Sequence, residues 1–269
     1  MKKMMIVLTI LFAFAPLAQA GNKPATSDPH RFRGGIRNSP GERRLNVSQL
    51  GKVTDSLRNK TGFQEMRFDD AGFLVLGNRM NVVGGSASAR ELLIAAADSA
   101  RAFELEAKSH SQEVAFAHIT EGTAYSSFQT KVLIEVRQIR LDFADFKQLR
   151  GEREVIAAFD LGFAILHELA HGVLGLTDAV GETGQLGDCD GLINRMRREL
   201  NLPERQGYSA RIQANQFSQT GVTRLAELVF VMNDSGSGRD EAKRFYLRWE
   251  AKQVIGLPSS KQAALIQYR

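Results

Sequence analysis

Residues 152–174 read EREVIAAFDLGFAILHELAHGVL and form the most apolar long segment after the N-terminal twenty residues. After its charged first turn, nearly every position before His167 is apolar, and Asp160 is the charged exception. The pattern predicts one long helix from Glu152 to about Leu174, ended by Gly175. A helix that is apolar on nearly every side is normally the buried centre of a domain. The remaining elements should therefore pack around it.

This helix carries the sequence His167-Glu168-Leu169-Ala170-His171. Histidines one helical turn apart project from one face, so both imidazoles can reach a single zinc ion at about 2.0–2.1 Å. Glu168 lies about 100° further round the helix, where it can address a water molecule beside the metal. The alternative is a set of buried polar side chains bonded within the core, but the uncharged flanks favour a metal site. The sequence predicts one Zn²⁺ per chain.

The HELAH sequence with uncharged flanks resembles the zincin metallopeptidases. That resemblance implies a zinc-dependent peptide hydrolase with a two-lobed domain and a cleft above the active-site helix. The metzincin branch continues with Gly and His at the positions that here are Leu174 and Thr177, so that branch does not fit. The gluzincin branch takes its third ligand from a carboxylate on a second helix, with an acidic or amide side chain one helical turn beyond it.

The gluzincin-like resemblance points to Asp190 as the third metal ligand. Asn194 follows it by one turn on a helix expected from about residue 189 to residue 200, and Arg197 shares the same face. Asn194 would then hold a histidine ligand in the right tautomer.

Other acidic residues stay open as the third ligand, because spacing alone cannot place a loop in space. Glu182 is the main alternative, and Asp178 and Asp188 lie in the same intervening segment. Cys189 could bind the metal as a thiolate, although a small buried thiol is the commoner role. It is the only cysteine, so an intrachain disulfide is excluded.

A second resemblance follows the zinc motif. Residues 197–208 read RRELNLPERQGY, which is similar to metallopeptidase domains of bacterial effectors and Rhs-type toxins. This similarity implies that Tyr208, or else Arg197 or Arg205, donates to the oxyanion that forms at the scissile carbonyl. The alternative is structural: Arg197 favours a helix C-terminus, and Tyr208 packs.

The first twenty residues predict export. Lys2 and Lys3 precede an apolar run and the small-residue sequence Ala18-Gln19-Ala20, which is the pattern of a secretory signal peptide. We expect a mature, periplasmic or secreted chain that begins at Gly21 and has no stable membrane anchor. Without the two lysines, 33 basic side chains face 30 acidic ones, a net charge of +3. That balance gives no reason to expect a nucleic-acid partner.

The expected fold class is α+β and zincin-like, with a small mixed sheet packed on the buried active-site helix. Residues 21–44 should form a flexible basic arm, and residues 45–269 the metallopeptidase domain, with lobes at about 45–175 and 176–269. Val114–Ile119 and Val132–Phe143 should be strands, the latter with a bulge or break. A capping box at Ser88 and Glu91 should begin a helix that runs to about Ala107. The second lobe should be mainly helical, with Phe245 and Trp249 on its last helix.

The sequence therefore predicts an exported zinc metallopeptidase that acts on protein or peptide substrates. Glu168 would move the proton, Tyr208 would steady the oxyanion, and the strand region would offer an edge for an extended substrate. The alternative is an exported protein without turnover, in which a structural zinc or a degenerate zincin site serves a binding module. A fourth protein ligand would distinguish that protein, because it closes the coordination shell.

Overall fold

The computed structural model describes residues 33–108, 116–126, 133–179, 185–207, 210–218, 221–232 and 242–251. Its elements form small sheets and several helices in mixed order, compatible with the α+β class. The predicted signal peptide and the first half of the predicted arm, residues 21–32, lie outside the described residues, as do Glu182 and Tyr208.

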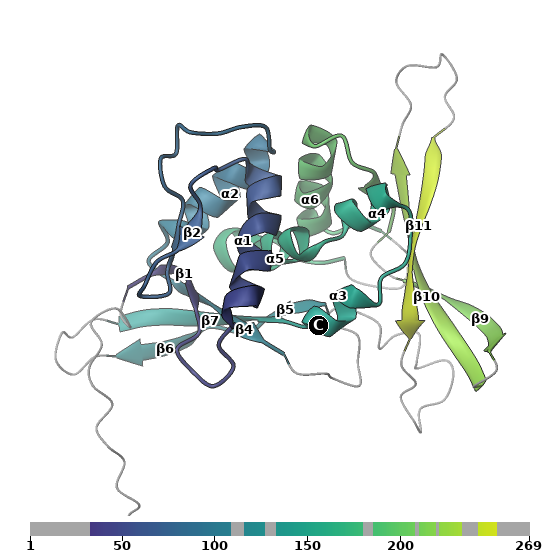
Figure 1. Ribbon diagram of the computed structural model, residues 1–269, viewed down its shortest axis with the longest axis horizontal. Helices are drawn as coiled ribbons and strands as arrows, with labels where there is room; N and C mark the ends of the chain where they lie inside the picture. The colour runs from purple at the N-terminus through teal and green to yellow at the C-terminus, as the bar shows by residue number, and fades with distance from the viewer. Residues whose placement is uncertain are drawn as a thin grey trace, which may run out of the picture. The chain divides into compact units, whose positions relative to one another are not determined.

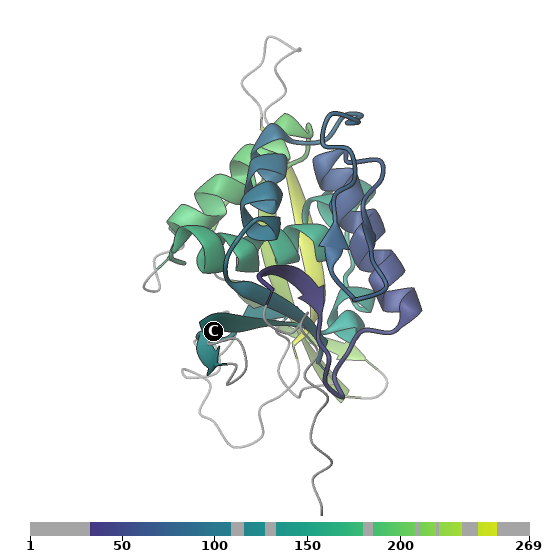
Figure 2. The same cartoon turned by 90° about the vertical axis from the view of Figure 1, so that its left-hand side faces the viewer.

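The first sheet lies under the helices, as Figures 1 and 2 show. Its strand order is β1-β4-β7-β5, and β6 also pairs with β7. β1 and β4 run parallel to their neighbours, whereas β5 and β6 are antiparallel to β7. The strands are β1 (Gly35–Asn38), β4 (Ala102–Ala107), β5 (Ala117–Ile119), β6 (Thr123–Ser126) and β7 (Leu133–Leu141).

β1 falls inside the range predicted to be a flexible arm. Ile36 is 1% exposed and joins the main core, while Arg37 forms a buried ion pair with Glu104 of β4 at 2.7 Å. A two-stranded sheet of β2 (Arg67–Phe68) and β3 (Leu74–Val75) adjoins this region. The prediction of a flexible arm was wrong for these residues. A segment with few large apolar side chains can still form a strand when a neighbouring strand provides partners for its backbone hydrogen bonds.

β7 is one continuous strand, and its register with β4 shows no bulge. Ile134 and Val136 pack in a small cluster with Ala102, whereas Ile139 and Leu141 join the main core. The apolar phase shift in the sequence therefore reflects two apolar layers on opposite faces of one strand.

Two helices that precede β4 pack over the sheet. α1 (Val47–Thr61) has a capping box at Asn46 and ends at Gly62, and α2 (Ala87–Ala97) is capped by Ser86. The predicted capping box at Ser88 was wrong, and the helix does not continue to Ala107. Ser86 accepts from Ala89 N at 3.0 Å, and the chain turns into β4 before it reaches the predicted end.

The predicted long helix is divided into three parts: α4 (Arg153–Ala158), α5 (Leu161–Leu169) and a π-helical turn, η2 (Ala170–Leu174). The division occurs because Asp160 acts as an N-cap, accepting from Phe163 N at 3.1 Å. Lys60 fixes this break with an ion pair to Asp160 at 2.8 Å and a hydrogen bond to Ala157 O.

By length and composition alone, residues 153–174 could cross a membrane, but 72% of the segment's apolar window is buried in the protein. Leu166 and Leu169 on α5 are fully buried in the main core. Such a buried segment is typical of a central core helix.

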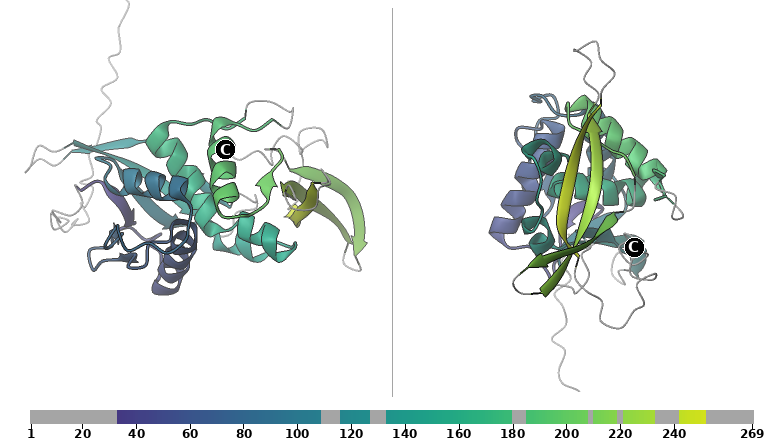
Figure 3. Two further views of the ribbon diagram at one scale, coloured as in Figure 1. Left: turned by 90° about the horizontal axis from the view of Figure 1, so that it is seen from above. Right: turned by 90° about the vertical axis from the view of Figure 1, so that its right-hand side faces the viewer.

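The C-terminal part is mainly β-structure, which corrects the expectation of a helical second lobe. After α6 (Asp188–Glu199), a second sheet runs in the order β11-β10-β8, and β9 also pairs with β10 (Figure 3). Phe245 and Trp249 lie on β11 and pack with Val155 of α4 in a second core. The short helix α3 is Phe143–Lys147, and the strands are β8 (Glu204–Arg205), β9 (Arg211–Ser218), β10 (Gly221–Met232) and β11 (Lys243–Ala251).

Candidate metal centre

Two glycines allow α5 and η2 to sit close to their neighbours. A Cβ on Gly162 would lie 2.7 Å from Ser56 Oγ of α1, and one on Gly172 would lie 2.5 Å from Phe103 Cε1 of β4. Real Cβ atoms do not approach other atoms this closely. The histidine-bearing segment is therefore wedged between α1 and the sheet.

Both histidines have their Nδ1 atoms engaged. His171 Nδ1 lies 2.6 Å from Leu176 O, which can only accept, so Nδ1 carries the proton. His167 Nδ1 lies 3.3 Å from Cys189 Sγ. The Cys189 thiol donates to the backbone oxygen of His167 at 3.4 Å. The thiol can thus donate to the carbonyl and accept from the ring. Both contacts leave the Nε2 lone pairs available, which is how histidine ligands are usually oriented.

The two Nε2 atoms converge on one carboxylate oxygen, Oδ1 of Asp178. His167 Nε2 and His171 Nε2 are 3.2 Å apart, and they lie 3.1 Å and 3.4 Å from Asp178 Oδ1. Nitrogen and oxygen ligands at about 2.0–2.1 Å from a tetrahedral zinc are separated by about 3.3 Å. The triangle of donor atoms has the size that such an ion requires.

Cys189 is a fourth group in this cluster. Each of the four side chains, His167, His171, Asp178 and Cys189, offers one ligand atom, and all four atoms lie within 4.8 Å of one another. The cluster is therefore a possible metal-binding site. The sulfur adjoins Nδ1 of His167 rather than its Nε2, so in this arrangement it supports the ligand ring.

The charges of the cluster also suit a cation. Burial lowers the pKa of His171, but Asp178 and Cys189 outweigh burial and raise that pKa to about 11. The same groups raise the pKa of His167 to about 10 against a strong opposing effect of burial. Two protonated Nε2 atoms would repel each other at 3.2 Å. A single shared cation satisfies both rings and the carboxylate at once.

Glu168 lies next to this cluster and is 5% exposed. Its Oε2 accepts from Ile119 N of β5 at 2.9 Å, which fixes the carboxyl against the sheet edge. Burial raises the pKa of Glu168, whereas the imidazoles of His167, His171 and His118 lower it. A raised pKa brings a carboxyl closer to the range in which it can both accept and return a proton.

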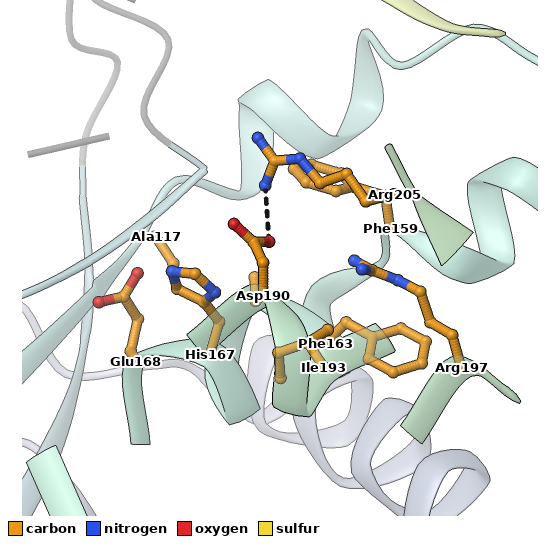
Figure 4. Close-up of a pocket in the computed structure, with 10 residues that line it drawn as sticks. Ala117, Phe159, Phe163, His167, Glu168, Asp190, Ile193, Arg197 and Arg205 are labelled. Carbon is orange, nitrogen blue, oxygen red and sulfur yellow. Dashed lines mark hydrogen bonds and ion pairs between the residues drawn. The ribbon is translucent and has the colours of Figure 1, made fainter. Parts of the chain in front are cut away.

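Asp190 is not one of the four residues whose ligand atoms form the cluster, contrary to the expectation from spacing. Asp190 Oδ1 pairs with Arg205 Nη1 of β8 at 3.3 Å (Figure 4). Successive helical residues are separated by about 100°. Cys189 contacts Nδ1 of His167, so the side chain of Asp190 projects from α6 in a different direction and its Oδ1 reaches Arg205.

Asn194 and Arg197 join α6 to neighbouring elements rather than to the histidines. Asn194 Oδ1 accepts from Arg205 N at 2.9 Å and from an Arg197 Nη1 at 2.7 Å. Arg197 Nε donates to Ala158 O at 2.9 Å, and its guanidinium lies 5.2 Å from the Phe163 ring centroid. These contacts fix the packing of α6, β8 and α4.

Asp178 takes the position that the spacing had favoured for Asp190. The sequence left it among the open alternatives, because it lies in a segment with no helical or strand period. The contact that positions it is tertiary: Cys189 N donates to Thr177 O at 3.3 Å, which holds the segment against the start of α6. His118 was not singled out, since one histidine in a strand pattern carries no metal-ligand spacing.

No family model, curated protein or solved structure matches this chain.

Proposed function

We propose that this protein is a zinc-dependent peptidase with a zincin-like, gluzincin-like arrangement. The observation that carries the proposal is the triangle of His167 Nε2, His171 Nε2 and Asp178 Oδ1, with edges of 3.1–3.4 Å. Glu168 is buried immediately beside it. His167, His171 and Asp178 would hold the metal. This assignment replaces Asp190 with Asp178 and keeps the two histidines.

Held by His167, His171 and Asp178, zinc would supply Lewis acidity and would lower the pKa of a water toward neutral pH. Glu168 accepts the proton of the attacking water on its carboxylate. It then gives this proton to the amine nitrogen as the carbon–nitrogen bond of the peptide breaks. Tyr208 remains the proposed donor to the oxyanion, on the similarity of residues 197–208.

The edge of the first sheet supports an extended peptide substrate. β5 ends the order β1-β4-β7-β5, and Thr120 N bonds back to Gln138 O at 2.9 Å. In an antiparallel pair, alternate residues point their backbone groups away from the partner. Ile119 N accordingly points to Glu168, and Ala117 would present its own backbone N–H and C=O to a peptide.

The direct test replaces Glu168 with Gln. We expect the variant to retain zinc, measured by plasma mass spectrometry, and to lose about 10²–10⁴-fold in cleavage of a denatured protein, the range for a lost general base. Glu121→Gln, at an exposed position beyond β5, is the matched control and should cleave normally. Unchanged activity in Glu168→Gln would refute the proposal.

Cys189 favours a second candidate, a structural zinc site without turnover. If the thiolate binds the ion as a fourth ligand, it closes the shell. X-ray absorption of the zinc-loaded protein separates the two functions. A sulfur neighbour at about 2.3 Å supports the structural site, whereas nitrogen and oxygen neighbours alone support the peptidase. Cys189→Ala should then keep its zinc.

The proposal includes export of the chain, on the pattern of residues 1–20. Expression with the native N-terminus should give an exported protein whose intact mass corresponds to a start at Gly21. A retained N-terminus on the exported protein would contradict this part of the proposal without affecting the metal centre.

A further inference from the structure

A small cavity opens beside the proposed reacting groups. His167 and Glu168 form part of its wall, and the remaining lining is largely apolar, from Ala117, Phe163, Ala164 and Ile193. Asp190, Arg197 and Arg205 supply its charged groups (Figure 4). A substrate side chain next to the reacting bond would therefore enter this cavity.

The cavity presents a hydrogen-bond acceptor. Asp190 is 1% exposed, and its Oδ1 is paired with Arg205. Its Oδ2 is buried, and no group of the described residues donates to it. In Figure 4 the second carboxylate oxygen points away from Arg205, toward the side on which His167 lies. A buried carboxylate oxygen without a donor is costly, so an occupant of the cavity should supply one.

The arginines that line the cavity already donate within the protein. Arg197 donates to Asn194 Oδ1 and Ala158 O, and Arg205 donates to Gly207 O and Asp190 Oδ1. An acidic side chain would therefore bring its oxygens toward the carboxylate of Asp190. This arrangement disfavours acceptors and favours a side chain that donates.

The size of the cavity limits the occupant. Its volume is about 20 Å³, whereas a cavity known to bind benzene measures about 150 Å³. Aromatic and long basic side chains are excluded by this comparison. A side chain of two or three heavy atoms fits. Serine and threonine fit and donate through a hydroxyl, whereas cysteine fits but its S–H is only a weak donor.

We infer that this cavity selects serine or threonine next to the cleaved bond, with the substrate hydroxyl donating to Asp190 Oδ2. The inference rests on the proposed peptidase function, because it takes His167 and Glu168 as the reacting groups. Asp190, expected from the sequence to bind metal, would then determine specificity.

A peptide library tests the inference. The zinc-loaded protein digests a proteome-derived peptide mixture, and mass spectrometry identifies the residues on both sides of each cleaved bond. We expect serine and threonine to be enriched on one side. A matched pair of peptides with Ser or Ala at that position should differ about tenfold in kcat/KM, as a hydrogen bond to a charged group allows. A well-cleaved library with no such enrichment overturns the inference.

Two variants locate the preference in the cavity. Asp190→Asn keeps the shape but can turn an amide N–H toward the cavity, so the tenfold preference for Ser over Ala should disappear. Ala164→Val adds two methyl groups to the cavity wall and leaves both members of the Asp190–Arg205 pair in place, so it should shift the preference to glycine. Asp188→Asn, at an exposed position on the same turn of α6, should cleave with the wild-type preference.

A thermal unfolding curve shows whether Asp190→Asn folds. If it does not, Ala164→Val alone tests whether the cavity sets the preference for serine and threonine. A Ser and Thr preference that survives in every folded variant of the pair overturns the inference.

Binding separates this inference from the peptidase proposal. Fluorescence anisotropy measures the affinity of labelled Ser and Ala peptides for the zinc-loaded Glu168→Gln protein. If no peptide is cleaved by the wild type, but the Ser peptide binds about tenfold more tightly, the preference of the cavity for a hydroxyl stands, and the peptidase proposal fails together with the cleaved bond. If peptides are cleaved and bound without discrimination, the reverse holds.

Discussion

At the residue scale, the site depends on which carboxylate reaches the two imidazoles. Asp178 and Asp190 are both acidic and lie twelve residues apart in sequence, yet only Asp178 has an oxygen within 3.4 Å of both Nε2 atoms. One oxygen of Asp190 forms an ion pair with Arg205 instead. Substitution of the two residues should therefore affect zinc affinity differently.

Asp178→Asn should lower zinc affinity by about 100-fold or more, since even groups that only orient ligands contribute about 10–100-fold. Competition with a chelator of known affinity measures the change. Asp190→Asn is the matched control and should bind one zinc as the wild type does. Equal losses in both variants would contradict the assignment of Asp178.

At the element scale, the close contact of η2 with the sheet decides where His171 lies. Gly172 touches Phe103, and a methyl group there would also lie 2.9 Å from Ile119 Cδ1. Gly172→Ala should destabilise the metal-free protein by about 1–3 kcal/mol, the usual cost of overpacking. It should also weaken zinc binding, because the neighbouring His171 must shift. Urea unfolding and chelator competition measure the two effects.

Gly51→Ala is the control for that substitution. Gly51 lies exposed within α1, and no atom lies within 4 Å of its ideal Cβ. Alanine in a helix interior is better than glycine by about 0.5–1 kcal/mol. This variant should therefore be more stable than the wild type, with unchanged zinc binding. A loss of stability there would show that helix propensity does not govern α1.

The start of α2 gives a pH-dependent prediction. Burial raises the pKa of Glu199, but hydrogen bonds from Ser86 and Ser88 outweigh this effect and lower it from 4.5 to about 2. The Glu199 carboxylate accepts from Ser86 Oγ at 2.6 Å and from Ser88 N at 3.0 Å. It thereby connects the end of α6 to the first turn of α2. Because the folded pKa is the lower one, this stabilisation is complete above about 4.5 and is lost as the pH falls through about 2.

Glu199→Gln should be less stable than the wild type by about 1 kcal/mol at pH 7, a modest value because the carboxyl is solvent-exposed. The difference should shrink as the pH falls from about 4.5 toward 2. Chemical denaturation at several pH values measures it, with Glu91→Gln on the exposed face of α2 as the control. A difference that does not vary with pH would contradict the assigned role of Glu199.

At the scale of the whole molecule, a bound zinc would connect the central helix to the segment before α6. Two apolar cores exist independently of the metal, one around α5 and one between α4 and the second sheet. The metal-free protein should therefore stay folded. Zinc at about 100 times its Kd adds about 2.7 kcal/mol, so the melting temperature should rise by about 5–10 °C.

Scanning calorimetry with and without a chelator checks this prediction, with His171→Ala as the variant that should show no zinc-dependent shift. Complete unfolding of the wild type on zinc removal would favour the structural-zinc alternative. In that case the metal, rather than the two cores, would be the main source of stability.

Local sequence patterns predicted a buried central helix, although not its division into three parts, and the placement of Glu168 between His167 and His171. These features are local: helical spacing fixes which side chains share a face, and apolar flanks fix burial. The sequence also indicated strands near residues 114–119 and 132–143, within a few residues of β5 and β7.

The carboxylate partner of the two histidines depends on tertiary contacts. Asp178, Glu182, Asp188 and Asp190 are equivalent by composition, and a backbone contact between Thr177 and Cys189 selects Asp178 among the described residues. The break at Asp160 depends on Lys60, about a hundred residues earlier in the chain. The second sheet pairs β10 with β8, where Phe230 lies opposite Arg205. Such contacts join residues that are far apart in sequence, so local patterns do not contain them.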